Sequence, residues 1–155
     1  MIHVMSLIIP FAILLPNLFF FVIPPRNMPA EGGESARPIL KLSEGIGRLG
    51  VFVLPLFSTI HSDNPYEVVF LLAMFVFLAI YGAGWLRYYV RGRGYELLFS
   101  PMYGMPVPLA ISPILYFISA SVVLHSPLLF LSSLLLALGH IPLSLDTYHH
   151  NNHRT

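Results

Sequence analysis

Five long stretches of predominantly apolar residues dominate the sequence and leave only short polar segments between them. They cover residues 4–24, 45–60, 68–90, 106–124 and 127–145. A helix needs about 20 mostly apolar residues to cross the hydrocarbon core of a bilayer. We therefore expect residues 1–155 to form a single integral membrane domain. Its fold would be an all-α, polytopic bundle of five transmembrane helices, with proline kinks in several of them.

The scarcity of charge agrees with this environment. Only 10% of the residues are charged, whereas a typical soluble domain has about 25%. The formal net charge is +1 and the chain has no cysteine. These values argue against a nucleic-acid partner and exclude disulfides, thiolate metal sites and cysteine nucleophiles. We expect the lipid bilayer as the main partner and no cofactor.

The basic residues predict an orientation. In a five-crossing arrangement every Lys and Arg falls on the same side of the membrane: Arg26, Arg37, Lys41, Arg48, Arg87, Arg91, Arg93 and Arg154. The positive-inside rule makes that side cytoplasmic, with the N-terminus outside and the C-terminus inside. The expected location is the cytoplasmic membrane of a prokaryote. Trp85, Tyr88 and Tyr89 fall near the inner boundary, where aromatic rings commonly anchor a helix at the headgroups.

The second stretch is the shortest, and it begins beside two charged residues. Glu44 and Arg48 are four residues apart, so they can form an ion pair on one helical face. Gly45, Gly47 and Gly50 favour close approach of another helix. We expect a structural salt bridge here, with ligand contact as the alternative.

Six polar side chains fall at a similar depth, in the cytoplasmic half of the expected bundle: Asn17, Glu44, Arg48, Tyr81, Ser112 and His140. Pro16, Pro113 and Pro142 lie beside three of them, and each proline removes one helical hydrogen bond. Gly82, Gly84 and Gly139 allow close backbone approach at this depth. The coincidence predicts a polar, partly unwound ligand site; ordinary helix packing is the alternative explanation.

The C-terminal segment is rich in histidine. Asp146 and His150 are one helical turn apart, as are His149 and His153, and such pairs can chelate a divalent metal. Chain ends commonly fray, so these four residues are weak metal candidates and we assign no metal. His140 with Asp146 could instead form a proton relay.

Three functions remain open. The first is a non-enzymatic binding or transport module for a small or amphiphilic molecule, either as a single chain or as a homo-oligomer. The second is a membrane enzyme that acts on a lipid or isoprenoid-like substrate at the inner interface through His140, Asp146 and Glu44. The third is a structural or accessory subunit of a membrane complex. No family resemblance covers enough of the chain to transfer a site.

Overall fold

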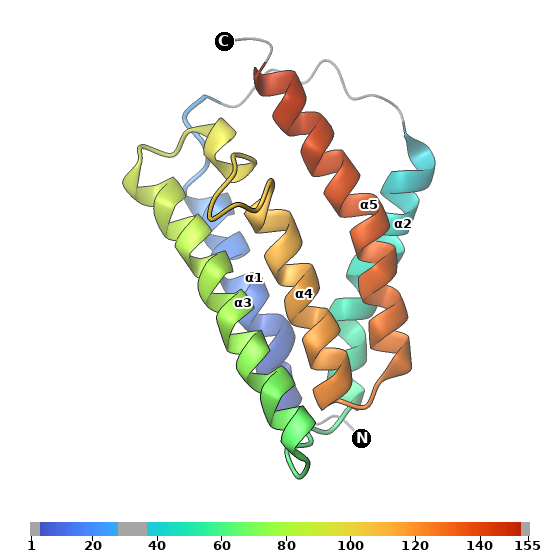
Figure 1. The fold of residues 1–155 in the computed structure, drawn as a ribbon. Helices are drawn as coiled ribbons and strands as arrows, with labels where there is room; N and C mark the ends of the chain where they lie inside the picture. The colour runs from blue at the N-terminus through green and yellow to red at the C-terminus, as the bar shows by residue number, and fades with distance from the viewer. Residues whose placement is uncertain (1–3, 28–36, 153–155) are drawn as a thin grey trace.

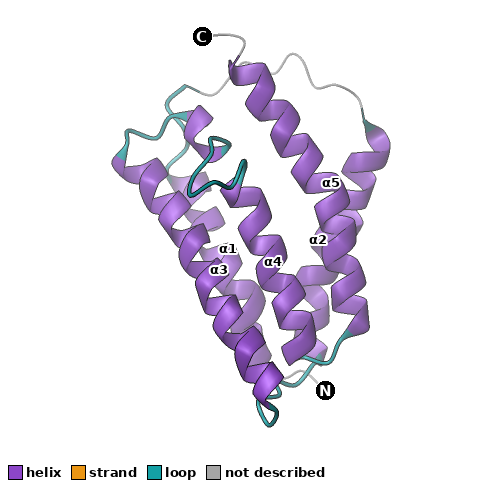
Figure 2. Ribbon diagram, in the orientation of Figure 1, coloured by secondary structure: helices purple, strands orange, loops and turns teal. Residues whose placement is uncertain are grey.

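The computed structural model describes residues 4–27 and 37–152, which form five α-helices without a β-sheet among these residues (Figures 1 and 2). The helices are α1 (Ile8–Val22), α2 (Pro38–Val53), α3 (Pro65–Val90), α4 (Pro108–Val123) and α5 (Pro127–Asn152). Short 3-10 turns cover Val4–Leu7, Leu54–Phe57 and Tyr95–Leu98. The all-helical expectation is confirmed.

Proline marks the start of four of the five helices: Pro38, Pro65, Pro108 and Pro127. Proline suits a first helical turn because the amide hydrogen it lacks would have no partner there, and its φ angle is already helical. Pro16, Pro113 and Pro142 lie inside α1, α4 and α5, which continue through them. Prolines therefore delimit most helices in this chain.

Successive helices run in alternating directions, so the connections gather at two ends of the bundle (Figure 1). We call one the basic end; it carries Arg26, Arg37, Arg91 and Arg93 and lies at the top of Figure 1. The opposite end, with His61 and His125 in its loops, is the histidine end. The helix order thus separates most of the basic side chains from the other end.

Three helical segments are long and apolar enough to cross a membrane: Met5–Val22, Pro65–Val90 and Pro127–His150. The helix Pro108–Val123 is apolar but shorter. The second predicted stretch, 45–60, differs most from the structure, because its helix starts at Pro38 and ends at Val53. The first two turns of α2 contain Lys41, Ser43 and Glu44, so a search for apolar runs misses where this helix begins.

Helices α2 and α5 make the closest helix–helix contact. A Cβ atom added at Gly47 would lie 2.3 Å from the backbone nitrogen of Leu136, and one added at Gly139 would lie 2.4 Å from the Leu40 carbonyl oxygen. Gly50 lies similarly close to the Ser132 side chain. The expected role of Gly47, Gly50 and Gly139 in helix approach is confirmed. Gly45 and Gly82, by contrast, face open space.

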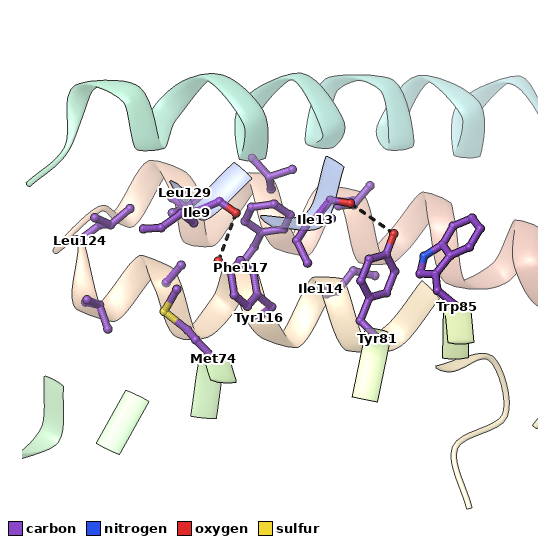
Figure 3. Packing of buried hydrophobic residues seen from close by; sticks show 14 of the residues in the cluster. Ile9, Ile13, Met74, Tyr81, Trp85, Ile114, Tyr116, Phe117, Leu124 and Leu129 are labelled. Atoms are coloured by element: carbon purple, nitrogen blue, oxygen red, sulfur yellow. Dashed lines mark hydrogen bonds between the residues drawn. The ribbon is translucent and has the colours of Figure 1, made fainter. Parts of the chain in front are cut away.

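The remaining core joins α1, α3 and α4. Gly84 of α3 lies against the Leu109 side chain of α4, and Phe117 of α4 is almost fully buried. Helix α1 inserts Ile9 and Ile13 into this core (Figure 3). Helix α1 therefore packs on α3, α2 packs on α5, and α4 joins the two sets of helices (Figure 1).

Candidate functional site: a polar cluster between α1, α2, α3 and α5

Asn17 of α1 and Tyr81 of α3 form the first of two polar groups. The Asn17 amide Nδ2 donates a hydrogen bond to the Tyr81 hydroxyl at 2.9 Å and another to the Ile13 carbonyl at 3.0 Å. The Tyr81 hydroxyl also reaches the Ile13 carbonyl at 3.5 Å (Figure 3). These contacts give hydrogen-bond partners to the Asn17 amide, the Tyr81 hydroxyl and the Ile13 carbonyl, which lie about one helical turn from Pro16. Polar groups in an apolar environment need such partners within the protein.

Glu44, Arg48 and His140 form the second group, between α2 and α5. Glu44 Oε1 accepts a hydrogen bond from the Arg48 guanidinium, which confirms the expected ion pair. The same oxygen lies 2.8 Å from Nδ1 of His140. The hydrogen bond with His140 is the main cause that lowers the pKa of Glu44 below its usual value, and the Arg48 charge contributes. This carboxylate is therefore shared by two basic groups.

Arg48 lies on the face of α2 that turns toward the interior of the bundle. Val51 and Phe52, three and four residues further along, share that face. Val51 is fully buried, and the Phe52 ring meets the Phe117 ring of α4 edge-on at 5.9 Å. The Arg48 side chain nevertheless keeps 55% of its surface exposed. The inward-turned face of α2 therefore carries an accessible cation near the basic end.

Among the described residues, no hydrogen bond or ion pair joins the two polar groups. Arg48 and Tyr89 both lie within electrostatic range of the Tyr81 hydroxyl. The Trp85 ring stands at 6.3 Å from the Tyr81 ring and stacks on the Tyr89 ring at 5.9 Å. Asn17, Glu44, Arg48, Tyr81 and His140, all predicted from the sequence, therefore belong to one neighbourhood.

Two further groups in this neighbourhood lack a well-formed hydrogen bond. The Tyr89 hydroxyl is buried without a partner, and Nε1 of Trp85, although close enough to the Tyr81 hydroxyl to interact with it as a donor, does not reach ordinary hydrogen-bond geometry. A buried donor without an acceptor costs about 1–3 kcal/mol, so a structure that keeps two together calls for an explanation. The sequence placed both residues at the lipid interface as anchors, but Trp85 is only 6% exposed and packs inside the bundle.

Other predicted residues lie elsewhere or have protein partners. The Ser112 hydroxyl donates to the Pro108 carbonyl of its own helix at 2.5 Å and does not join the cluster. Asp146 pairs with Arg37 at 3.2 Å, and no hydrogen bond joins it to His140 or Glu44 among the described residues.

The C-terminal end of α5, which lies at the basic end of the bundle (Figure 1), does not bring potential metal ligands together. Within residues 4–27 and 37–152, no three His, Asp or Glu side chains are placed to hold a metal ion. His149 and His150 are exposed at the end of α5, and His153 lies outside the described residues. The metal candidates therefore stay predictions.

The sequence reasoning missed the structural role of Arg87. Its guanidinium donates to the carbonyls of Leu97, Ser100 and Pro101 at 2.8, 2.8 and 2.9 Å, and to the Ser100 hydroxyl at 2.9 Å. One side chain thus holds the loop that closes the basic end beside the cluster. No local pattern indicates this contact, because its acceptors are main-chain carbonyls.

A second missed cluster lies at the histidine end. Glu67, with a side chain only 1% exposed, contacts Nε2 of His125 at 2.8 Å. It also accepts hydrogen bonds from the backbone and the side chain of Asn64. The His61 ring stacks on His125 at 4.2 Å between centroids. An Asn followed by Pro and then by Glu at the third position is a helix-capping pattern and could have revealed Glu67.

Comparisons with protein-family models, with curated proteins and with solved structures each found no match to this chain.

Proposed function

We propose that the chain is an integral membrane protein of five crossings that binds an amphiphile with an anionic head group. Its basic end faces the cytoplasm, and the ligand site is the neighbourhood of Tyr81 near that end. The alternating helix directions support the crossing number, and the collection of arginine at one end supports the orientation.

One observation carries the choice of ligand: the unused hydrogen-bonding capacity around Tyr81 consists of donors. A guanidinium has five donors, and among the described residues Arg48 hydrogen-bonds to Glu44 alone. Trp85 Nε1 can only donate, and the Tyr89 hydroxyl can also donate. A carboxylate, phosphate or sulfonate would accept from such groups, and charge-assisted bonds of this kind are the stronger ones.

The surroundings suit an amphiphile rather than a fully polar anion. Helix α1 exposes large apolar side chains near its end, on the same helix as Asn17. The exposed residues are Leu18, Phe19, Phe21 and Val22. An alkyl chain can therefore stay against lipid-facing surface while its head group reaches Arg48.

The chain provides its own probe, because Trp85 is its single tryptophan. We would place the protein in phosphatidylcholine nanodiscs and titrate dodecanesulfonate while recording tryptophan fluorescence. Dodecyltrimethylammonium, with the same alkyl length and the opposite charge, is the matched ligand control. A saturable change with the sulfonate alone is expected; equal responses to both amphiphiles, or none, would overturn the proposal.

Variants locate the site. Arg48→Gln should weaken sulfonate binding about tenfold or more, since one charge-assisted contact is lost. Arg48→Lys should retain part of the affinity, and Arg91→Gln, at an exposed position of the basic end, should leave it unchanged. Size-exclusion profiles establish that each variant is folded. Unaltered binding by a folded Arg48→Gln protein would contradict the assigned site.

Two sources of such a ligand exist, a bilayer phospholipid and a free single-chain amphiphile. Nanodiscs that contain phosphatidylglycerol distinguish them. If the occupant is the phospholipid, phosphatidylglycerol should compete with the sulfonate for the Trp85 signal; if it is a single-chain molecule, the sulfonate titration should not change.

A further inference from the structure

We infer that an anionic ligand binds at this site together with a proton, which is taken up by the Glu44–His140 pair. The inference rests on the proposed function, because it concerns the regulation of the same site. It starts from the position of one atom, Glu44 Oε1, which is the shared partner of Arg48 and His140.

The shared oxygen places the proposed anion close to an existing negative charge. Any head group that contacts the Arg48 guanidinium also approaches the Glu44 carboxylate, because these two side chains are hydrogen-bonded to each other. Like charges that share a site disfavour each other's ionised form. The surroundings weaken screening by solvent, since the Glu44 side chain is only 17% exposed. The second anion therefore needs a compensating positive charge.

His140 is positioned to supply that charge. Its Nδ1 lies 2.8 Å from Glu44 Oε1, so Nδ1 can donate its hydrogen to the carboxylate while Nε2 accepts a proton. Histidine is the side chain whose ordinary titration falls near neutral pH. The balance is simple: one anion and one proton enter, and the summed charge of the ligand, Glu44, Arg48 and His140 stays the same.

The other charged and titratable groups around the pair do not compete for this proton. On α2, the basic side chains near the pair are Lys41 and Arg48, and Arg48 is hydrogen-bonded to Glu44. On α5, Asp146 is held by Arg37 as an ion pair. Helix α3 contributes the Tyr81 hydroxyl, which is hydrogen-bonded to Asn17. The imidazole in contact with Glu44 is therefore the group to which the inference assigns the proton.

Calorimetry in two buffers tests the inference. Dodecanesulfonate is suitable because its head group does not titrate near neutral pH. Its binding enthalpy at pH 7 would be measured in Bis-Tris and in Tris, two amine buffers that differ in the heat of ionisation and do not add an anion of the ligand's class. The difference gives the number of protons taken up. The wild-type protein should take up a substantial fraction of one proton per ligand, rising as the pH is lowered toward 6.

His140→Gln and Glu44→Gln should each still bind the sulfonate, with proton uptake reduced to near zero. In Glu44→Gln the carboxylate that opposes the ligand is gone, so binding should also lose its pH dependence. His149→Gln is the matched control, an exposed histidine on the same helix, and should keep the wild-type uptake. Binding by the wild-type protein without proton uptake would overturn the inference and leave the proposed function standing. Absence of binding would overturn both.

Discussion

Gly139 of α5 lies so close to Glu44 of α2 that a Cβ atom at position 139 would stand 2.5 Å from the Glu44 backbone nitrogen. The glycine thus lets the two helices approach closely enough for the neighbouring residue, His140, to reach the Glu44 carboxylate. The geometry of the proposed site depends on this contact, because a wider separation would break the hydrogen bond.

The first prediction concerns these helix contacts. Gly139→Ala and Gly47→Ala should each lower the free energy of unfolding by about 1–3 kcal/mol, because the added methyl group meets backbone atoms that cannot move aside. Gly45→Ala is the matched control on α2, where the added atom meets nothing within 4 Å. It should be neutral or stabilising by up to about 1 kcal/mol. Thermal unfolding in a nonionic detergent compares the three, and equal effects at positions 45 and 47 would refute the contact.

The second prediction concerns pH. The pKa of Glu44 is lowered in the folded state, chiefly by the hydrogen bond with His140. A lowered carboxyl pKa stabilises the fold at pH above the usual 4.5, and this stabilisation is lost as the pH falls through the folded-state value. The melting temperature should therefore fall more steeply below about pH 4.5 in the wild-type protein than in Glu44→Gln. Parallel curves would show that the carboxylate makes no such contribution.

The third prediction concerns the Arg87 contacts. Arg87→Lys keeps the charge but loses the planar fork of donors that reaches three carbonyls. Amide hydrogen exchange in residues 94–104 should accelerate about tenfold or more, since at least one net hydrogen bond is lost. Arg91→Lys, at the exposed end of α3, should have no effect. Unchanged exchange in Arg87→Lys would mean that the loop is held by other contacts.

The fourth prediction concerns topology. The chain has no cysteine, so single cysteines at Arg26, Asp63, Arg91 and Pro127 report sidedness without background. In intact bacterial cells a membrane-impermeant maleimide should label positions 63 and 127, and label 26 and 91 only after lysis. Labelling of positions 26 and 63 from the same side would show that α2 does not cross.

The fifth prediction concerns the buried carboxylate at the histidine end. Glu67→Ala should lower the melting temperature clearly, because it removes the partner of His125 and the cap of α3. Asp63→Ala, at an exposed position four residues earlier, should change it little. A similar small change in both variants would contradict a structural role for Glu67.

The sequence predicted α1, α3 and α4 closely because a long apolar run is a direct signal of a helix; for α5 it predicted the start at Pro127 but ended the helix at 145, seven residues before Asn152. The expected stretch 68–90 and the observed Pro65–Val90 differ only by a polar first turn. The start of α2 at Pro38 was missed because its first turns are polar. The site was predicted in part for a similar reason. The position of a residue along its helix predicts that Asn17 and Tyr81 lie at the same depth, but it does not indicate in which direction a side chain points around the helix axis. For this reason the sequence did not predict that the Ser112 hydroxyl bonds to its own helix or that Trp85 points into the bundle.

Two main-chain carbonyls of helix α1 accept hydrogen bonds from later helices, and this has a consequence for biogenesis. The hydroxyls of Tyr81 and Tyr116 that reach Ile13 and Ile9 lie 68 and 107 residues further along the chain. A ribosome therefore delivers α1 to the membrane long before its partners exist. The contact with Tyr81 can form once α3 has been made, but the contact with Tyr116 requires α4 as well. The docking of α1 is in this way completed only after three later helices have been synthesised.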